Sequence, residues 1–356
     1  MNTTIQQDSN SGIVALTHLI HRFFLPILLG SYLCAGFLPQ LGLVLRQISF
    51  GSINLPGMGQ TKVSLALAML SFLLFNAGLG IRTSELSGLR KKPQVLIVGF
   101  LANILLPMAL VISVSGLMAN WHNTDELQNL LVGIALIIAM PIAGSSAAWS
   151  QNANGNLSLS LGLVLASTIL SPLTTPLVLN CFGMITQGDY SEDLHEMAQQ
   201  GTNAFLCLTV VFPSLAGMGV HYLLGERKTG LIKPYMKLAN FIILLVLNYS
   251  NACTSLPQAF AKPDWDLLAL ILASTLVICL VAFFAGWLVA FSFKADRADK
   301  AALMFSLGMN NNGTGLVLAS TALADHPAVL LPMIFYTLVQ QVLAALVDWR
   351  IFKTED

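Results

Sequence analysis

The sequence predicts an all-α membrane protein in which ten transmembrane helices form two inverted repeats of five. Three observations predict this class. Of the 356 residues, 55% are hydrophobic and only 10% are charged, whereas a soluble protein carries roughly 25% charged residues. Lysine and arginine are distributed very unevenly between the two sides of the predicted spans. Two apolar segments, at 140–146 and 308–315, are interrupted by residues that form helices poorly.

Ten stretches of the chain have the length and apolar character of a membrane-spanning helix, which needs about 20 mostly apolar residues. They cover roughly 23–45, 61–81, 94–118, 127–150, 157–181, 203–224, 234–254, 266–293, 299–323 and 327–349. The two five-helix repeats occupy 22–181 and 203–351. Between them lies a predicted acidic outer loop at 182–202. Residues 1–21 and 352–356 are predicted as polar N-terminal and C-terminal tails.

The positions of the charges support this count and set an orientation. With the N-terminus in the cytoplasm, fourteen Lys and Arg residues fall on the cytoplasmic side, and only Arg46, Lys62 and Lys262 fall outside. Cytoplasmic loops carry an excess of Lys and Arg, so we expect both termini to be cytoplasmic. The protein is then an integral multi-pass protein, of the plasma (inner) membrane if it is bacterial. Five spans per half also insert the second half upside down.

The two breaks fall in the fourth helix of each half. In a membrane, broken helix backbone survives only where protein buries it or where it lines a watery cavity. Paired breaks in two repeats indicate the binding site of a secondary transporter. The residues we expect to line a solute site are Ser145 and Ser146 of the first break, Asn310, Asn311 and Asn312 of the second, and Asn103 of the third span. The alternative is that these polar side chains only join helices by hydrogen bonds.

Other functional classes are poorly supported. The zero net charge argues against a nucleic-acid partner. No nucleophile–base arrangement, phosphate loop or metal-ligand spacing is visible, so we expect no enzyme, no cofactor and no metal beyond Na⁺. No Asp, Glu, Lys or Arg lies near the middle of a span, which leaves no side-chain proton relay. The expected partners are a small solute and the lipid bilayer, and the oligomeric state is not readable from the sequence.

Several motifs carry a resemblance to a known family. The strongest is PIAGSSAAWSQNANGNLSLSLGLVLASTILSPLTTPLVL, from Pro141 to Leu179, and the second is GMNNNGTGLVLAS, from Gly308 to Ser320. RKKP before the third span and FPSLAGMGV in the sixth also fit. In this order and spacing the chain resembles the bile acid:sodium symporter family, from about Arg22 to its C-terminus. The resemblance implies ten helices in a panel domain and a core domain, with crossed broken helices, and co-transport of organic anions with two Na⁺ ions.

The family's sodium ligands are only partly kept. The acidic residue shared by both sodium sites falls on Ser306, and the glutamine of the second motif falls on Asn310, followed by a retained Asn311. Ser146 and Ser160 match family serines. The neighbouring asparagine and threonine fall on Ala147 and Val164, and the third-helix glutamine falls on Ala102, beside Asn103. The residues that the resemblance places near the ions are therefore Ser146, Ser160, Ser306, Met309 and Asn310.

The missing carboxylate predicts a changed mechanism. A shared acid supplies the only full counter-charge for two neighbouring cations, which otherwise repel each other. Carbonyls and hydroxyls can still hold one cation. We therefore expect a transporter of a small organic anion or related solute in which sodium coupling is weakened or lost.

Two alternatives stay open. One is an arsenite-type carrier, although the cysteine expected in its fourth helix is absent and Met140 precedes Pro141. The other is a membrane protein that binds a ligand as a sensor without transporting it.

Overall fold

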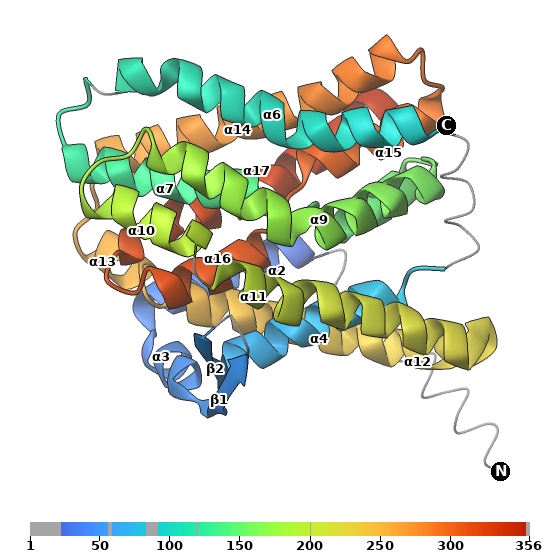
Figure 1. The fold of residues 1–356 in the computed structure, drawn as a ribbon, viewed down its shortest axis with the longest axis horizontal. Helices are drawn as coiled ribbons and strands as arrows, with labels where there is room; N and C mark the ends of the chain where they lie inside the picture. The colour runs from blue at the N-terminus through green and yellow to red at the C-terminus, as the bar shows by residue number, and fades with distance from the viewer. Residues whose placement is uncertain (1–22, 56–58, 83–91, 119, 200, 354–356) are drawn as a thin grey trace.

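The computed structural model describes residues 23–55, 59–82, 92–118, 120–199 and 201–353 (Figure 1). The predicted tail at 1–21 lies outside these residues. The helices are α2 (Phe24–Phe37), α3 (Gln40–Gln47), α4 (Leu65–Leu79), α6 (Pro93–Met118), α7 (Thr124–Ala139), α8 (Ser145–Asn152), α9 (Leu157–Gly183), α10 (Asp189–Gln199), α11 (Thr202–Leu206), α12 (Phe212–Ala252), α13 (Leu256–Ala261), α14 (Trp265–Ser292), α15 (Arg297–Gly308), α16 (Asn312–Ala322) and α17 (Leu330–Val347).

The fold is that of an α-helical membrane protein. Five helical stretches in the described residues are long and apolar enough to cross a membrane, and they lie at Pro93–Gly116, Leu157–Gly183, Thr202–Ala252, Trp265–Ser292 and Pro327–Phe352. A sixth is formed if α2 and α3, which meet at 90°, count as one bent span. The other predicted spans correspond to shorter or broken helices, so the ten-helix repeat stays a prediction.

Both predicted breaks are present. The fourth predicted span is divided into α7 and α8, and the ninth into α15 and α16. Met140 is extended (φ −78°, ψ 147°), as expected for a residue that precedes a proline. Met309 is likewise extended (φ −130°, ψ 113°) between Gly308 and the asparagines. Local sequence thus ends each helix where poor helix formers begin.

Two features were not predicted. The stretch between the sixth and seventh predicted spans is helical, so both spans run together in α12. The sixth predicted span ends at 224, next to an elbow at Gly225, whose positive φ of 73° suits a residue without Cβ. A hairpin precedes α4, in which β1 (Ser49–Leu55) pairs antiparallel with β2 (Gly59–Ser64). The predicted span 61–81 therefore starts too early. Helix α4 begins only after Ser64, whose hydroxyl accepts a hydrogen bond from the Leu67 N–H at 3.2 Å.

The segment 182–202, predicted as a loop, contains the amphipathic helix α10. Its buried residues Leu194, Met197 and Ala198 share one face at helical spacing, and its carboxylates share the other. The predicted C-terminal tail starts at 352, but a π-helical turn covers Asp348–Phe352, so Phe352 still belongs to the helical part of the chain. The Phe352 ring is buried, 5.6 Å from the ring of Phe305 between centroids.

The helices are layered around the two broken pairs. In Figure 1 the long helices run along the horizontal axis, with α4 against α12 at one edge and α6 against α14 at the other. Helices α7, α9 and α17 lie between these edges. Every α7 residue from Leu130 to Ala139 is buried, as is every α15 residue from Ala301 to Gly308. A helix that is apolar all round belongs in a core.

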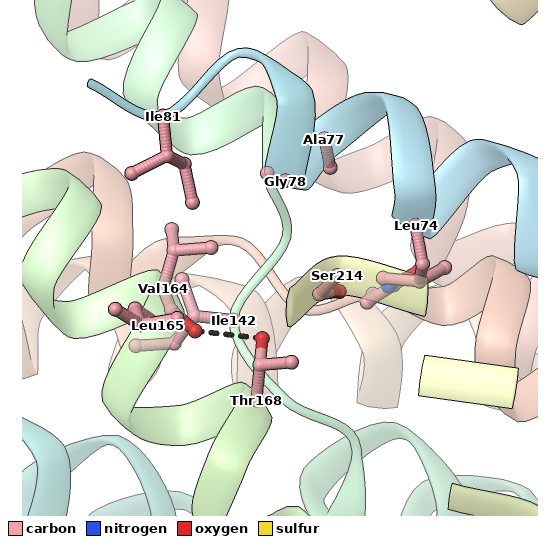
Figure 2. Close-up of a pocket in the computed structure, with 11 residues that line it drawn as sticks. Leu74, Ala77, Gly78, Ile81, Ile142, Val164, Leu165, Thr168 and Ser214 are labelled. Atoms are coloured by element: carbon pink, nitrogen blue, oxygen red, sulfur yellow. Dashed lines mark hydrogen bonds between the residues drawn. The ribbon is translucent and has the colours of Figure 1, made fainter. Parts of the chain in front are cut away.

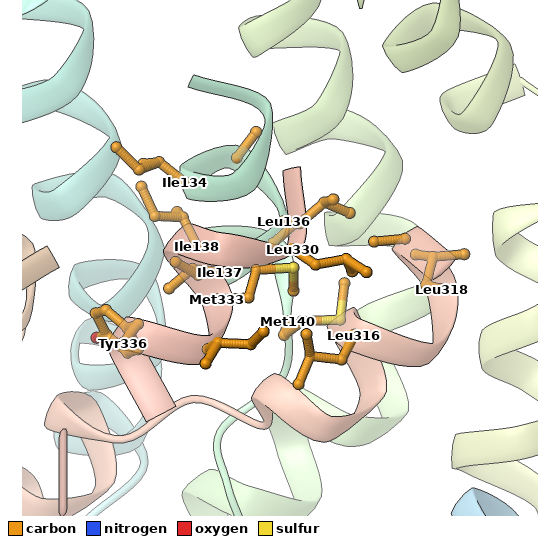
Figure 3. Packing of buried hydrophobic residues seen from close by; sticks show 14 of the residues in the cluster. Ile134, Leu136, Ile137, Ile138, Met140, Leu316, Leu318, Leu330, Met333 and Tyr336 are labelled. Atoms are coloured by element: carbon orange, nitrogen blue, oxygen red, sulfur yellow. The ribbon is translucent and has the colours of Figure 1, made fainter. Parts of the chain in front are cut away.

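The core closes directly around the breaks. Figure 3 shows Met140 of the first break beside Leu316 of α16, with Leu330 and Met333 of α17 next to them. Packing is tight at Gly315, because a Cβ there would lie 2.4 Å from Cε of Met333. The backbone of both breaks is therefore held by protein rather than by lipid, as a broken span requires.

Candidate functional site

The two breaks cross each other and pair as two short antiparallel strands. Ile142 and Asn310 form a β-bridge. The Ala143 N–H donates to the Met309 carbonyl at 2.9 Å, and the Asn311 N–H donates to the Pro141 carbonyl at 2.8 Å. These bonds satisfy backbone groups that a broken helix leaves open. Helices α8 and α16 both begin at this crossing. The dipoles of the two helices place partial positive charge at their N-termini, and therefore at the crossing.

Asn310 joins the crossing to three other helices. Its Nδ2 donates to the Ile137 carbonyl of α7 at 2.9 Å, and its Oδ1 accepts from Asn103 Nδ2 of α6 at 3.3 Å. Its backbone N–H donates to Gln340 Oε1 of α17 at 3.2 Å. Asn103 Nδ2 also lies 3.0 Å from the Leu307 carbonyl. Both polar atoms of the Asn310 side chain are thus hydrogen-bonded. Asn103 and Asn310 together hold the crossing in this conformation.

Asn311 and Asn312 have different surroundings. The Asn311 Oδ1 accepts from the Thr314 N–H at 3.4 Å, so Asn311 caps α16, and the residue also lines a cavity. Asn312 is 2% exposed, and neither its Oδ1 nor its Nδ2 has a hydrogen-bond partner among the described residues. An unpaired buried amide is costly. Of the three consecutive asparagines, Asn312 is therefore the one whose two polar side-chain atoms both lack partners among the described residues.

Two of the predicted ion residues, Ser160 and Ser306, form a buried hydroxyl pair. Ser160 Oγ of α9 and Ser306 Oγ of α15 are 2.9 Å apart, and both residues are fully buried. Ser146 of α8 is also fully buried, and its Oγ has no partner among the described residues. The Met309 carbonyl already accepts the Ala143 N–H. Ser145, by contrast, is exposed.

A cavity lies beside the crossing. Its volume is about 20 Å³. The walls are Leu74, Ala77 and Gly78 of α4 and Ile81 just beyond it, Ile142 and Gly144 of the first break, Val164, Leu165 and Thr168 of α9, Ser214 of α12, and Asn311. Figure 2 shows the α4 residues facing Ile142 and α9 across the space. The cavity is mostly apolar, with three polar side chains.

Of the residues predicted to line a solute site, one lines the cavity and the others do not. Asn311 lines it, whereas Ser145, Ser146, Asn310, Asn312 and Asn103 do not. Val164, which stands where the family has a threonine, contributes an apolar wall. Thr168 Oγ1, one turn further along α9, donates to the Val164 carbonyl at 2.7 Å. Figure 2 shows this bond as a dashed line, so the hydroxyl proton is already used.

Sequence reasoning missed several residues that shape the site. Gln340 of α17 accepts the Asn310 N–H, and Ser167 Oγ of α9 accepts the Ile142 N–H at 3.0 Å. Thr175 Oγ1 donates to the Ala139 carbonyl at 2.7 Å, at the end of α7. A signal for Gln340 was present, because Gln340 and Gln341 are two amides inside an apolar span. No such signal marks Ala77 or Gly78 as cavity walls.

Comparison with known proteins establishes the family. The model of the SBF-like CPA transporter family matches residues 21–350. The chain belongs to this family. It is 28% identical over 225 residues to the uncharacterized protein YbaS of Bacillus subtilis (strain 168), covering 63% of this chain and 70% of YbaS. It is 24% identical over 263 residues to a protein of the same organism described as the uncharacterized sodium-dependent transporter YocS, covering 73% of this chain and 75% of YocS.

The family membership confirms the resemblance that the motifs predicted. This is a membrane protein of a transporter family, with its two signature breaks paired at the centre of the fold.

Proposed function

We propose that this protein is a secondary-active transporter of a small organic anion or related solute, working by alternating access. The observation that carries the proposal is the antiparallel crossing of the two breaks beside a cavity. Helix N-termini at the crossing favour an anionic group, and the apolar walls favour an organic body. Binding sites of secondary transporters are built from such discontinuous helices.

The proposed architecture assigns the helices to two inverted repeats. Helices α2 to α9 supply the first five spans and α11 to α17 the second five, with both termini in the cytoplasm. Helices α2, α3, α4 and α12 would form the panel, and α6 to α9 and α14 to α17 the core. The cavity then lies where the panel meets the core, between α4 and α9. Movement of one group against the other would open it to either side.

The narrowness of the cavity supports a moving mechanism. The cavity has a volume of about 20 Å³, which holds about one water molecule rather than an organic solute. Helix α4 must therefore move away from α9 and the crossing before a solute enters. The conformation described is consistent with one in which the transport pathway is almost closed.

Sodium coupling is proposed to be weakened or lost. In the position of the family's shared acid, Ser306 offers a neutral hydroxyl that is already 2.9 Å from Ser160 Oγ. Asn310 Oδ1 and the Met309 carbonyl are also occupied by protein donors. A cation would have to displace these donors without gaining a carboxylate. The cost of dehydrating Na⁺ would then be poorly offset.

Flux in proteoliposomes tests the proposal. Labelled acetate, benzoate, succinate and a steroid sulfate are offered to liposomes containing the protein, in sodium or in choline buffer. We expect uptake of at least one solute above protein-free liposomes, with less than about a twofold difference between the two buffers. Failure of every solute to enter would favour the sensor alternative. Uptake of arsenite alone would favour the arsenite-type carrier.

A further inference from the structure

Arg46 occupies an unusual position at the end of α3. The residue is only partly exposed, and its guanidinium reaches two other helices. Nη1 donates to Asn251 Oδ1 of α12 at 3.1 Å, and Nη2 donates to the Ser320 carbonyl of α16 at 2.8 Å. Helix α3 is fixed there by close packing, because a Cβ on Gly42 would lie 2.4 Å from Cys253 Sγ. Arg46 thus joins the proposed panel to the second broken helix.

No carboxylate balances this charge within the described residues. None of the ion pairs found between them includes Arg46. Partial negative charge comes instead from the C-terminal ends of α16, which stops at Ala322, and α12, which stops at Ala252. A guanidinium has five N–H donors, and the two contacts above use only part of this capacity. The guanidinium therefore has N–H donors beyond these two contacts.

A second donor lies unused beside the guanidinium. Asn251 is fully buried, and its Nδ2 has no hydrogen-bond partner among the described residues. Its Oδ1 is fully engaged with Arg46 and with Ser320 Oγ at 3.5 Å, so the Nδ2 group is held next to the guanidinium. Ser255 Oγ, also buried, lacks a partner as well. An unpaired buried amide donor beside a guanidinium, as Asn251 Nδ2 provides here, is an arrangement that binds an oxyanion.

The cluster and the cavity lie at opposite ends of the same helices. Helix α16 starts next to Asn311, which lines the cavity, and reaches Arg46 at Ser320, about 13 Å further along at about 1.5 Å per residue. Helix α4 starts beside α3, where the Leu65 N–H donates to the Ile48 carbonyl at 2.9 Å, and it ends at Leu79, between the cavity-lining residues Gly78 and Ile81. Arg46 therefore lies on the side away from the cavity.

We propose that Arg46, with the Asn251 amide, is an oxyanion-binding site at the second mouth of the transport pathway. In the conformation described, the guanidinium holds α16 through the Ser320 carbonyl and keeps that mouth closed. When the mouth opens, the carbonyl withdraws and the freed N–H groups take the carboxylate, sulfate or phosphate group of the arriving solute. This inference rests on the proposed function, since it assigns the anion selectivity of that transporter to one residue.

Thermal unfolding tests the site without knowledge of the solute. The full-length protein in detergent is melted while choline acetate, benzoate or sulfate replaces choline chloride at fixed ionic strength. We expect a saturable rise in Tm with at least one of these oxyanions. The Arg46→Gln variant should need at least a tenfold higher concentration for the same rise. General stabilisation by sulfate acts on all variants alike and is removed by comparison with them.

Two further variants make the result decisive. Arg350→Gln removes an equal charge at an exposed arginine that stacks on Trp349, so it should keep the wild-type response. Asn251→Asp supplies Arg46 with an internal carboxylate, so it should fold at least as stably as wild type and lose the response. Equal responses to every oxyanion in wild type, Arg46→Gln and Asn251→Asp would overturn the proposal.

The two proposals fail in distinguishable ways. Uptake in proteoliposomes, together with oxyanion responses that do not depend on Arg46, would leave the transporter intact and remove the Arg46 site. An Arg46-dependent response in a protein that transports none of the offered solutes would keep the site and contradict the transport function.

Discussion

Asn310, Asn311 and Asn312 are consecutive, yet their side chains do three different things. Asn310 joins α7, α6 and α17, Asn311 caps α16 at the cavity, and Asn312 is buried without a partner among the described residues. From the sequence we predicted that all three line a solute site, with helix joining as the alternative. The structure favours the alternative for Asn310 in this conformation. The roles differ because each residue faces a different neighbour, which composition alone does not reveal.

Alanine substitutions should separate these roles. Asn310→Ala leaves the Ile137 carbonyl without its side-chain donor in the core, at about 1–3 kcal/mol for an unpaired buried group, and Asn103 Nδ2 keeps only its bond to the Leu307 carbonyl. Asn311→Ala loses only a helix cap, worth about 1 kcal/mol. We expect Tm to fall clearly more for Asn310→Ala, whereas Asn311→Ala should lose uptake at near-normal stability. Similar Tm values for the two variants would contradict the assignment.

Restoring the acid should restore sodium binding if the rest of the cage is still suitable. Ser306→Glu places a carboxylate beside Ser160 at a fully buried position, where an unpaired charge is costly. We expect a lower Tm than wild type in choline and a sodium-specific recovery. Ser306→Gln is the matched control, since it has nearly the same size without the charge. A sodium response equal in the Glu and Gln variants would mean that the carboxylate does not bind the ion.

At the scale of elements, α4 and α12 pack through glycines. A Cβ on Gly217 would lie 2.0 Å from the Phe75 carbonyl oxygen, and one on Gly78 would lie 1.9 Å from that of Ser214. Backbone atoms cannot yield as side chains do. Gly217→Ala should therefore lower stability by about 1–3 kcal/mol, the usual cost of overpacking. Thermal unfolding in detergent measures the difference.

Gly219 gives the matched control, because it is exposed on the same helix and a Cβ there meets nothing within 4 Å. Gly219→Ala should be neutral or stabilise α12 by about 0.5–1 kcal/mol. If Gly217→Ala were as stable as Gly219→Ala, the close approach of α4 and α12 would not be as described.

The elements that sequence could predict are those whose causes are local. Apolar length identified the regions of α6, α9, α14 and α17, and Gly, Pro and Asn marked both breaks. The predicted sixth span ends at 224, next to the elbow at Gly225, but the helical continuation through 226–233 and the 90° turn between α2 and α3 were missed. The hairpin was missed because short strands beside a span carry a weaker signal than the apolar run that follows them.

At the scale of the whole molecule, the account requires α4 to move relative to the crossing. A Cβ placed on Gly144 would lie 3.5 Å from Cβ of Ala77, at the short end of the range for a disulfide. In a background without the five native cysteines, Ala77→Cys with Gly144→Cys should form a bond that stops uptake. Reduction should restore it, and each single cysteine should transport normally. Full uptake by the oxidised double variant would exclude this movement.

With Ser306 in place of an acid, we propose that this protein has no charged sodium site. The most direct measurement is Tm of the purified protein across a sodium series, with choline holding ionic strength fixed. A ligand that binds only the folded state stabilises it by RT ln(1 + [L]/Kd), or about 2.7 kcal/mol at a hundredfold excess over Kd. We expect the sodium and choline curves to coincide, or to differ only weakly without saturating. A saturable, sodium-specific rise of that size would contradict the proposal.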